Sequence, residues 1–201
     1  LILKRLLGCF PKILSATSRI YTFKPMHNPT QVISTGTDPF CSAIIATIGR
    51  SSLSRAVESV LQQSIPNESF EVLVINDSGK PLPEAAWQTW KNVQIINTNQ
   101  RERSVARNTG AAIAKGTYLH FLDDDDWLAT GAYQSFYRMS RTSNAKWLYG
   151  MTQLVNRQGR PTIQLRHGLN GNCFVQAMAG EWIPLQASLI ERKAFLGVGG
   201  F

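Results

Sequence analysis

The chain has 201 residues, of which 43% are hydrophobic and 17% charged, so it is long enough for one domain with an apolar core and too apolar for a disordered protein. Its three cysteines are too few for a disulfide scaffold, and the sequence has neither the heptads of a coiled coil nor the glycine period of collagen. A net charge of +8 is compatible with nucleic acid, an anionic membrane or a phosphorylated substrate, and does not by itself choose among them.

Residues 1–38 are predicted to be a basic arm followed by a linker. The first 40 residues hold five basic residues and one acidic residue, so half of the excess positive charge lies in a fifth of the chain. A signal peptide needs an unbroken apolar stretch, and here the basic residues and Pro11 interrupt it. No apolar run reaches the length of about 18 residues that spans a membrane. Residues 1–24 are therefore either a basic amphipathic segment in contact with an anionic membrane or a surface helix or loose arm. We expect a cytoplasmic protein with reduced thiols, peripheral at the inner face of the membrane in the first case.

Residues 39–201 are predicted to form an α/β domain. Apolar, β-branched runs predict four buried strands, at 40–47, 70–76, 93–97 and 117–122. Helices are expected between and after them, from Ser51 or Ser52 to 65, over 84–90, from an N-cap at Ser104, and over 130–141. This alternation favours a mostly parallel sheet flanked by helices, with ligands at the carboxyl ends of the strands.

The last part of the domain, residues 129–201, has a different pattern. Two strands at 147–155 and 161–165 flank a polar turn and predict a hairpin. A loop is expected over 165–174, then a strand over 184–191 and a short helix over 192–196.

Four consecutive aspartates, Asp123 to Asp126, follow the fourth predicted strand. Adjacent carboxylates repel one another, and their place beside a buried strand favours compensation by a cation or a positively charged partner. Mg²⁺ or Mn²⁺ would suit these oxygen ligands. If the strand stays extended, Asp123 and Asp125 point to the same side. The alternative, which we consider weaker, is a solvated acidic turn.

Two further residues lie at the same predicted edge of the sheet. Asp77 ends the second strand and is equally compatible with a turn and with an acceptor for a base or sugar. Arg107, on the first turn of its helix, could bind phosphate or form a salt bridge with the aspartates. Arg101 and Arg103 are expected to be solvated.

These segments resemble family 2 glycosyltransferases with the GT-A fold. The similar motifs are AIIATIGR, VLVINDSG, the Ala-Arg-Asn-x-Gly helix at 106–110, Gly-x-Tyr at 116–118, Leu-Asp-x-Asp-Asp at 122–126 and the final Gly-Gly-Phe. The resemblance covers residues 40–201 and implies transfer of a sugar from a nucleotide-diphosphate donor, usually UDP-linked, to a saccharide, lipid or protein acceptor.

The resemblance also implies roles for individual residues. Ala46, Thr47 and Arg50 would line the nucleotide pocket, Asp77 would bind the base, and Arg107 would lie near the nucleotide or sugar. Asp123 and Asp125 would form the Asp-x-Asp motif, with Asp125 as direct metal ligand and Asp126 assisting. The family is inverting, and its usual base, an aspartate, would lie beyond Phe201, so we expect a fragment that lacks the base.

Other function classes are less well supported by the sequence. A catalytically incomplete module that binds a nucleotide sugar or an anionic surface stays open, because the arm is basic and the base is absent. Nucleic acid is not expected as a partner, because aromatic and basic residues do not alternate. A dinucleotide-binding enzyme is disfavoured, because no Gly-x-Gly-x-x-Gly follows the first strand.

Overall fold

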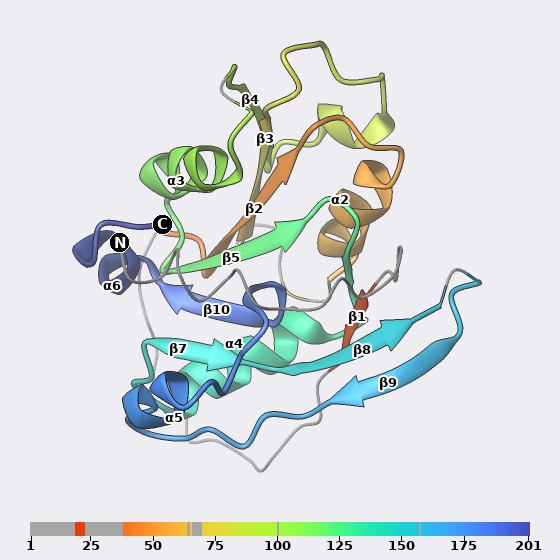
Figure 1. The fold of residues 1–201 in the computed structure, drawn as a ribbon. Helices are drawn as coiled ribbons and strands as arrows, with labels where there is room; N and C mark the ends of the chain where they lie inside the picture. The colour runs from red at the N-terminus through yellow and green to blue at the C-terminus, as the bar shows by residue number, and fades with distance from the viewer. Residues whose placement is uncertain (1–18, 23–37, 64, 66–69, 100, 157) are drawn as a thin grey trace.

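The computed structural model describes residues 19–22, 38–63, 65, 70–99, 101–156 and 158–201, and they form a large and a small β-sheet with helices (Figure 1). The large sheet has the strand order β4-β3-β2-β5-β10-β7. Its strands are β2 (Cys41–Thr47), β3 (Phe70–Asn76), β4 (Val93–Asn97), β5 (Tyr118–Asp123), β7 (Trp147–Tyr149) and β10 (Ser188–Glu191). Strands β4, β3, β2 and β5 are parallel, and β10 runs antiparallel to β5 and β7. The predicted α/β class with a mostly parallel sheet is confirmed.

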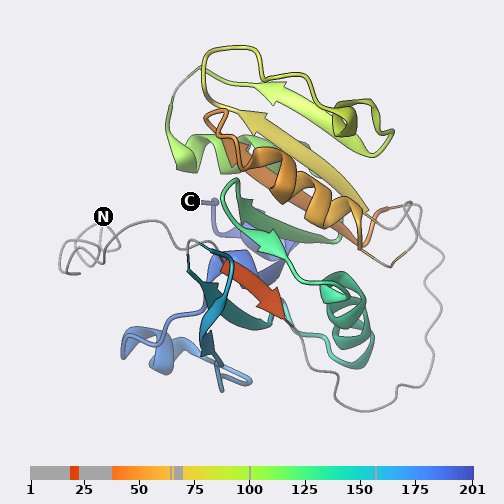
Figure 2. The same ribbon diagram turned by 90° about the vertical axis from the view of Figure 1, so that its right-hand side faces the viewer.

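Helices cover both faces of this sheet. The helical segments are α2 (Leu53–Leu61), η2 (Ala86–Thr89), α3 (Arg103–Ile113), α4 (Ala132–Thr142), α5 (Phe174–Met178), η3 (Leu185–Ala187) and α6 (Arg192–Gly197). Helices α2 and α4 bury their apolar side chains against one face, and α3 and α6 against the other. The two views of the ribbon show α2 and α3 on opposite sides of β2 and β3 (Figures 1 and 2). None of the helices in the described part of the chain is long and apolar enough to cross a membrane.

The small sheet has the order β6-β1-β8-β9 and was not predicted. It contains β1 (Arg19–Thr22), β6 (Trp127–Leu128), β8 (Met151–Val155) and β9 (Pro161–Leu165). Strands β8 and β9 form the predicted hairpin, whereas the strand predicted over 147–155 is divided at Gly150 between the two sheets. Strand β1 lies within the predicted arm and pairs with both β6 and β8, so residues 19–22 are part of the small sheet. The rest of segment 1–24 lies outside the described residues.

Some helix ends differ from the sequence predictions. The N-cap of helix α3 is Glu102, two residues before the predicted cap Ser104. The Glu102 carboxylate accepts from the first free backbone N–H groups, those of Ser104 and Val105. Ser52 is the N-cap of α2, but its side chain makes no capping hydrogen bond. The helix expected over 84–90 is a single 3₁₀ turn, η2.

Two glycines allow α3 and β5 to lie very close to β2. A Cβ atom on Gly116 would be 2.5 Å from both the Cys41 carbonyl carbon and the Ser42 nitrogen, and one on Gly110 would be 2.5 Å from Ile44 Cγ2. A side chain at position 116 would displace the backbone of β2, and one at position 110 would displace the side chain of Ile44. The chain thereby enters β5 beside β2 in register, with Cys41 opposite Tyr118.

A buried polar chain crosses the core on the α4 face. Burial lowers the pKa of His120 to about 4 and raises the pKa of Cys41 and Tyr133. The Tyr133 hydroxyl is 2.8 Å from His120 Nδ1, and the Gln186 carbonyl oxygen is 2.9 Å from His120 Nε2. The imidazole is fully buried and neutral at physiological pH.

Replacement of Gly116 by alanine is expected to destabilise the fold, because the new methyl group meets backbone atoms that cannot rotate away. We expect a loss of roughly 1–3 kcal/mol or more in the free energy of unfolding, measured by urea denaturation. Gly168→Ala is the matched control, because no atom lies within 4 Å of a Cβ at that position. Equal stability of the two variants would contradict the close approach.

Acidification is expected to destabilise the protein through His120. The folded pKa of about 4 lies below the unfolded value of roughly 6.5, so the unfolded state binds more protons between these values, and stability falls as the pH decreases through that window. Between pH 7 and pH 5 this one group removes about 2 kcal/mol. His120→Phe cannot titrate and should show a correspondingly flatter stability curve in urea. Parallel curves for the two proteins would show that His120 is not buried in the neutral form.

Candidate functional site

The parallel strands bring the predicted site residues to one edge of the large sheet. Ala46 lies opposite Asp123 in the β2–β5 pair, and Thr47 lies opposite Asn76 in the β2–β3 pair. The loop after β2, Asp77 after β3 and the aspartates after β5 are therefore neighbours, as their places at strand ends predicted.

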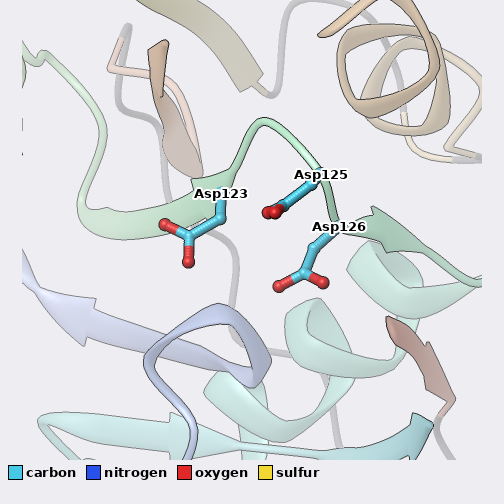
Figure 3. Close-up of side chains that lie close together, drawn as sticks. All are labelled: Asp123, Asp125 and Asp126. Carbon is cyan, nitrogen blue, oxygen red and sulfur yellow. The ribbon is translucent and has the colours of Figure 1, made fainter. Parts of the chain in front are cut away.

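Three of the four aspartates converge. Oxygen atoms of Asp123, Asp125 and Asp126 all lie within 4.8 Å of one another. Figure 3 shows the three side chains below the loop between β5 and β6, with the carboxyl group of Asp125 directed toward Asp123. The prediction relied on an extended strand, but β5 ends at Asp123, and the Asp126 N–H donates to the Asp123 carbonyl across a turn (3.1 Å). The turn therefore brings Asp126 to the group as well.

Asp123 is held by donors from two distant segments. Arg107 Nη2 donates to one carboxylate oxygen at 2.6 Å, and Gln186 Nε2 donates to the other at 2.5 Å. The salt bridge that the sequence offered as one role of Arg107 is present. Gln186, in η3, is a site residue that sequence analysis missed, and it is 63 positions from Asp123 along the chain.

Asp124, the remaining aspartate of the run, contacts the loop after β2 and was also missed. Its side chain is 2% exposed, accepts from Thr47 Oγ1 at 2.6 Å and forms an ion pair with Arg50 Nη1 at 2.5 Å. Asp125 is 57% exposed and lies 3.6 Å from the same guanidinium nitrogen of Arg50. The buried and exposed neighbours therefore have different roles: Asp124 ties the acidic turn to the loop after β2, and Asp125 faces outward.

Asp77 is a buried carboxylate that organises the loop before α3. It accepts from the Thr98 hydroxyl and from the backbone N–H of Arg101, both at 2.8 Å. Arg101 has a left-handed backbone with φ of 47°, which aims that N–H at Asp77. The turn role of Asp77 is thus present, and its carboxylate also lines the cavity described next.

A cavity of about 190 Å³ opens between the loops after β2, β3 and β5. Residues of both charges line it: Ala46, Thr47, Ile48, Arg50, Asp77, Arg101, Arg103, Ala106 and Asp124. Arg101 and Arg103 are exposed, as expected, and they also form part of the cavity wall, since α3 begins at Arg103 beside Asp77. Three guanidinium groups at one cavity suit a negatively charged ligand such as a phosphate.

Arg107 is fixed by the neighbouring residue Asn108 and by the Gly-Gly-Phe segment. The Asn108 amide nitrogen donates to the Phe201 carbonyl at 3.1 Å, and the Phe201 N–H donates to the Asn108 amide oxygen at 3.0 Å. The Phe201 ring lies 5.5 Å from the Arg107 guanidinium carbon. Gly200, with φ of 78°, provides the sharp bend that this arrangement needs.

The acidic turn carries oxygen ligands that could hold a divalent cation. Arg107 forms an ion pair with Asp123, and Arg50 lies within ion-pair distance of Asp124 and Asp125. Three carboxylates at the spacing of Asp123, Asp125 and Asp126 supply ligands of the oxygen type that Mg²⁺ and Mn²⁺ prefer.

Comparison with known proteins gives consistent matches. The family Glycosyl transferase family 2 matches residues 42–184. A poly(ribitol-phosphate) beta-glucosyltransferase of Bacillus spizizenii is 26% identical over 115 residues, which is 54% of this chain and 18% of that protein. The poly(ribitol-phosphate) beta-N-acetylglucosaminyltransferase TarP of Staphylococcus aureus is 30% identical over 103 residues, 49% of this chain and 32% of that protein. The chain thus spans less than a third of the length of these two relatives.

Structural comparison supports the fold over nearly the whole chain. The mannosyltransferase PcManGT from Pyrobaculum calidifontis, in complex with GDP-Man and Mn²⁺, superposes with a TM-score of 0.57 and 16% identity. The match covers 98% of this chain and 52% of that protein.

Loss of the Asp124 charge is expected to destabilise the protein, because its buried carboxylate joins Thr47 and Arg50 to the acidic turn. We expect Asp124→Asn to lower the free energy of unfolding by roughly 1.5–3 kcal/mol in urea denaturation. Asp125→Asn, at the exposed neighbouring position, is the matched control and should change it by about 0.5 kcal/mol or less. A larger loss of stability in Asp125→Asn than in Asp124→Asn would mean that Asp124 is not the aspartate that stabilises the fold.

Proposed function

The chain belongs to glycosyl transferase family 2. From that premise we propose that it binds a nucleotide-diphosphate sugar in the cavity lined by Arg50, Asp77 and Arg103. We propose further that it transfers the sugar to an acceptor hydroxyl with the help of a divalent metal ion. The observation that carries the proposal is the convergence of Asp123, Asp125 and Asp126 beside that cavity. UDP is the donor nucleotide that the family resemblance implies.

The residues of the cavity provide a plausible place for each part of the donor. Asp77 is held on the β3 side, where its carboxylate can accept hydrogen bonds from a base or ribose while Thr98 and Arg101 orient it. Ala46, Thr47 and Ala106 leave room between the loops because their side chains are small. Arg50, Arg101 and Arg103 supply donors for a diphosphate, whose charge they would offset by paired hydrogen bonds.

Asp123, Asp125 and Asp126 are the residues proposed to hold the metal ion. Their carboxylate oxygens are close enough to share one ion, and Asp125 is the most exposed of the ligands and so the one that can meet an incoming phosphate. When bound, Mg²⁺ or Mn²⁺ would act as a Lewis acid that stabilises the charge on a departing nucleoside diphosphate. Arg107 and Gln186 would keep Asp123 oriented toward that ion.

The proposed transfer is inverting and needs a general base for the acceptor hydroxyl. Glu191 does not suit this role: it pairs with Tyr118, five residues before Asp123 on β5, about 16 Å away along the strand. Glu181 lies exposed just after α5.

The proposal is tested by Asp125→Ala in the full-length protein. Calorimetric titration of Mn²⁺ and UDP should show a loss of Mn²⁺ affinity on the order of 100-fold, because a direct ligand is removed from an exposed position that contributes little to stability. Sugar transfer should fall with it.

Glu84→Ala is the control, since it removes an exposed acidic residue on another surface of the protein. Unchanged Mn²⁺ binding and transfer in Asp125→Ala would refute the metal site and the proposed function with it.

A further inference from the structure

One residue, Gln186, connects a buried histidine to the aspartate that ends β5. Its backbone carbonyl lies 2.9 Å from His120 Nε2, and its side-chain amide nitrogen lies 2.5 Å from Asp123 Oδ2. His120 and Asp123 are three residues apart on the same strand but on opposite faces of it. The hydrogen bonds therefore leave β5 at His120, pass through Gln186 and return to β5 at Asp123.

The donors and acceptors in this chain have a fixed direction. Because the Gln186 carbonyl only accepts, His120 Nε2 carries the hydrogen, and Nδ1 accepts from the Tyr133 hydroxyl at 2.8 Å. A carboxylate also only accepts, so the Gln186 amide nitrogen must face Asp123. Of the two neutral tautomers of the imidazole, only the Nε2–H form completes this arrangement.

The backbone of Gln186 is held on both sides of that contact. It lies in the short turn η3, where the Ala187 N–H donates to the Pro184 carbonyl at 3.0 Å and the Ala187 carbonyl accepts from Gly150 at 2.8 Å. A single turn leaves carbonyl groups without helical partners, and His120 supplies the donor for that of Gln186. His120 is fully buried and Gln186 is 9% exposed, so solvent competes little with these bonds.

We propose that His120 and Gln186 are positioning residues that fix the Asp123 carboxylate for a divalent ion at the acidic turn, an inference that rests on the proposed function. His120 fixes the backbone of Gln186, and the Gln186 side chain fixes one oxygen of Asp123 while Arg107 fixes the other. A carboxylate restrained at both oxygens loses little rotational freedom when it binds a cation, and groups that restrain metal ligands in this way affect metal affinity about as strongly as some ligands do.

The test measures Mn²⁺ affinity, from the electron paramagnetic resonance signal of free Mn²⁺, in full-length variants with and without UDP. Gln186→Leu, which removes the donor to Asp123, should weaken Mn²⁺ binding about tenfold. Tyr133→Phe keeps the His120–Gln186 bond and should lower the urea midpoint while it leaves Mn²⁺ affinity unchanged.

A pair of amide substitutions at His120 separates positioning from general stability. His120→Gln places an amide N–H near the position of Nε2 and should retain Mn²⁺ affinity close to that of the wild type. His120→Asn is too short to reach the Gln186 carbonyl and should weaken binding as much as Gln186→Leu does. The urea midpoints of the two amide variants should be similar, because both replace the same buried ring.

Wild-type Mn²⁺ affinity in Gln186→Leu would overturn the inference, as would equal affinity in His120→Gln and His120→Asn. If the His120 variants do not fold, Gln186→Leu decides alone. The Asp125→Ala variant separates failure of this inference from failure of the proposed function. If Asp125→Ala binds Mn²⁺ like the wild type, the proposed function is wrong. If Asp125→Ala loses Mn²⁺ binding but Gln186→Leu does not, only the role of His120 and Gln186 is wrong.

Discussion

Four negative charges in succession at the end of a buried strand need compensation, and the site is built from the groups that provide it. Asp123 draws on Arg107 from α3 and Gln186 from η3, and Asp124 draws on Thr47 and Arg50 from the end of β2. These partners lie between 16 and 77 positions away along the chain. The acidic turn thus connects α3, η3 and the end of β2, which the sheet alone would only bring near one another. Asp125 remains exposed, so its charge faces outward.

The close packing of small residues determines where the arginines lie. Gly110 lets α3 approach Ile44 of β2, and Gly116 lets the chain enter β5 against the backbone of Cys41 and Ser42. Helix α3 is therefore held so near the sheet that Arg107, on its first turns, reaches Asp123 directly. The segment from Ala106 to Asp126 combines both features, because its glycines set the distance between α3, β5 and β2, and its arginine and aspartates form the contact that this distance allows.

Much of the large sheet could be predicted from the sequence, because its strands are continuous apolar runs: the bounds of β3 and β4 are those expected from 70–76 and 93–97. The alternation of strands and helices also placed Asp77 and the aspartates at one edge. The small sheet could not be predicted, since β6 has two residues and its pairing with β1 spans over a hundred positions. The role of Asp124 was missed because a turn replaces the extended strand there, and Gln186 carries no local signal at all.

The two cysteines in the described part of the chain differ in burial, so their reactivity can report on local and global unfolding. Cys41 is fully buried beneath α4 and its thiol pKa is raised, so a thiol-reactive reagent can reach its thiolate only when the core separates. Cys173, at the start of α5, is half-buried on the outer part of the domain. Labelling at Cys173 would therefore follow local fluctuations of that region, and labelling at Cys41 would follow cooperative unfolding, without any introduced probe.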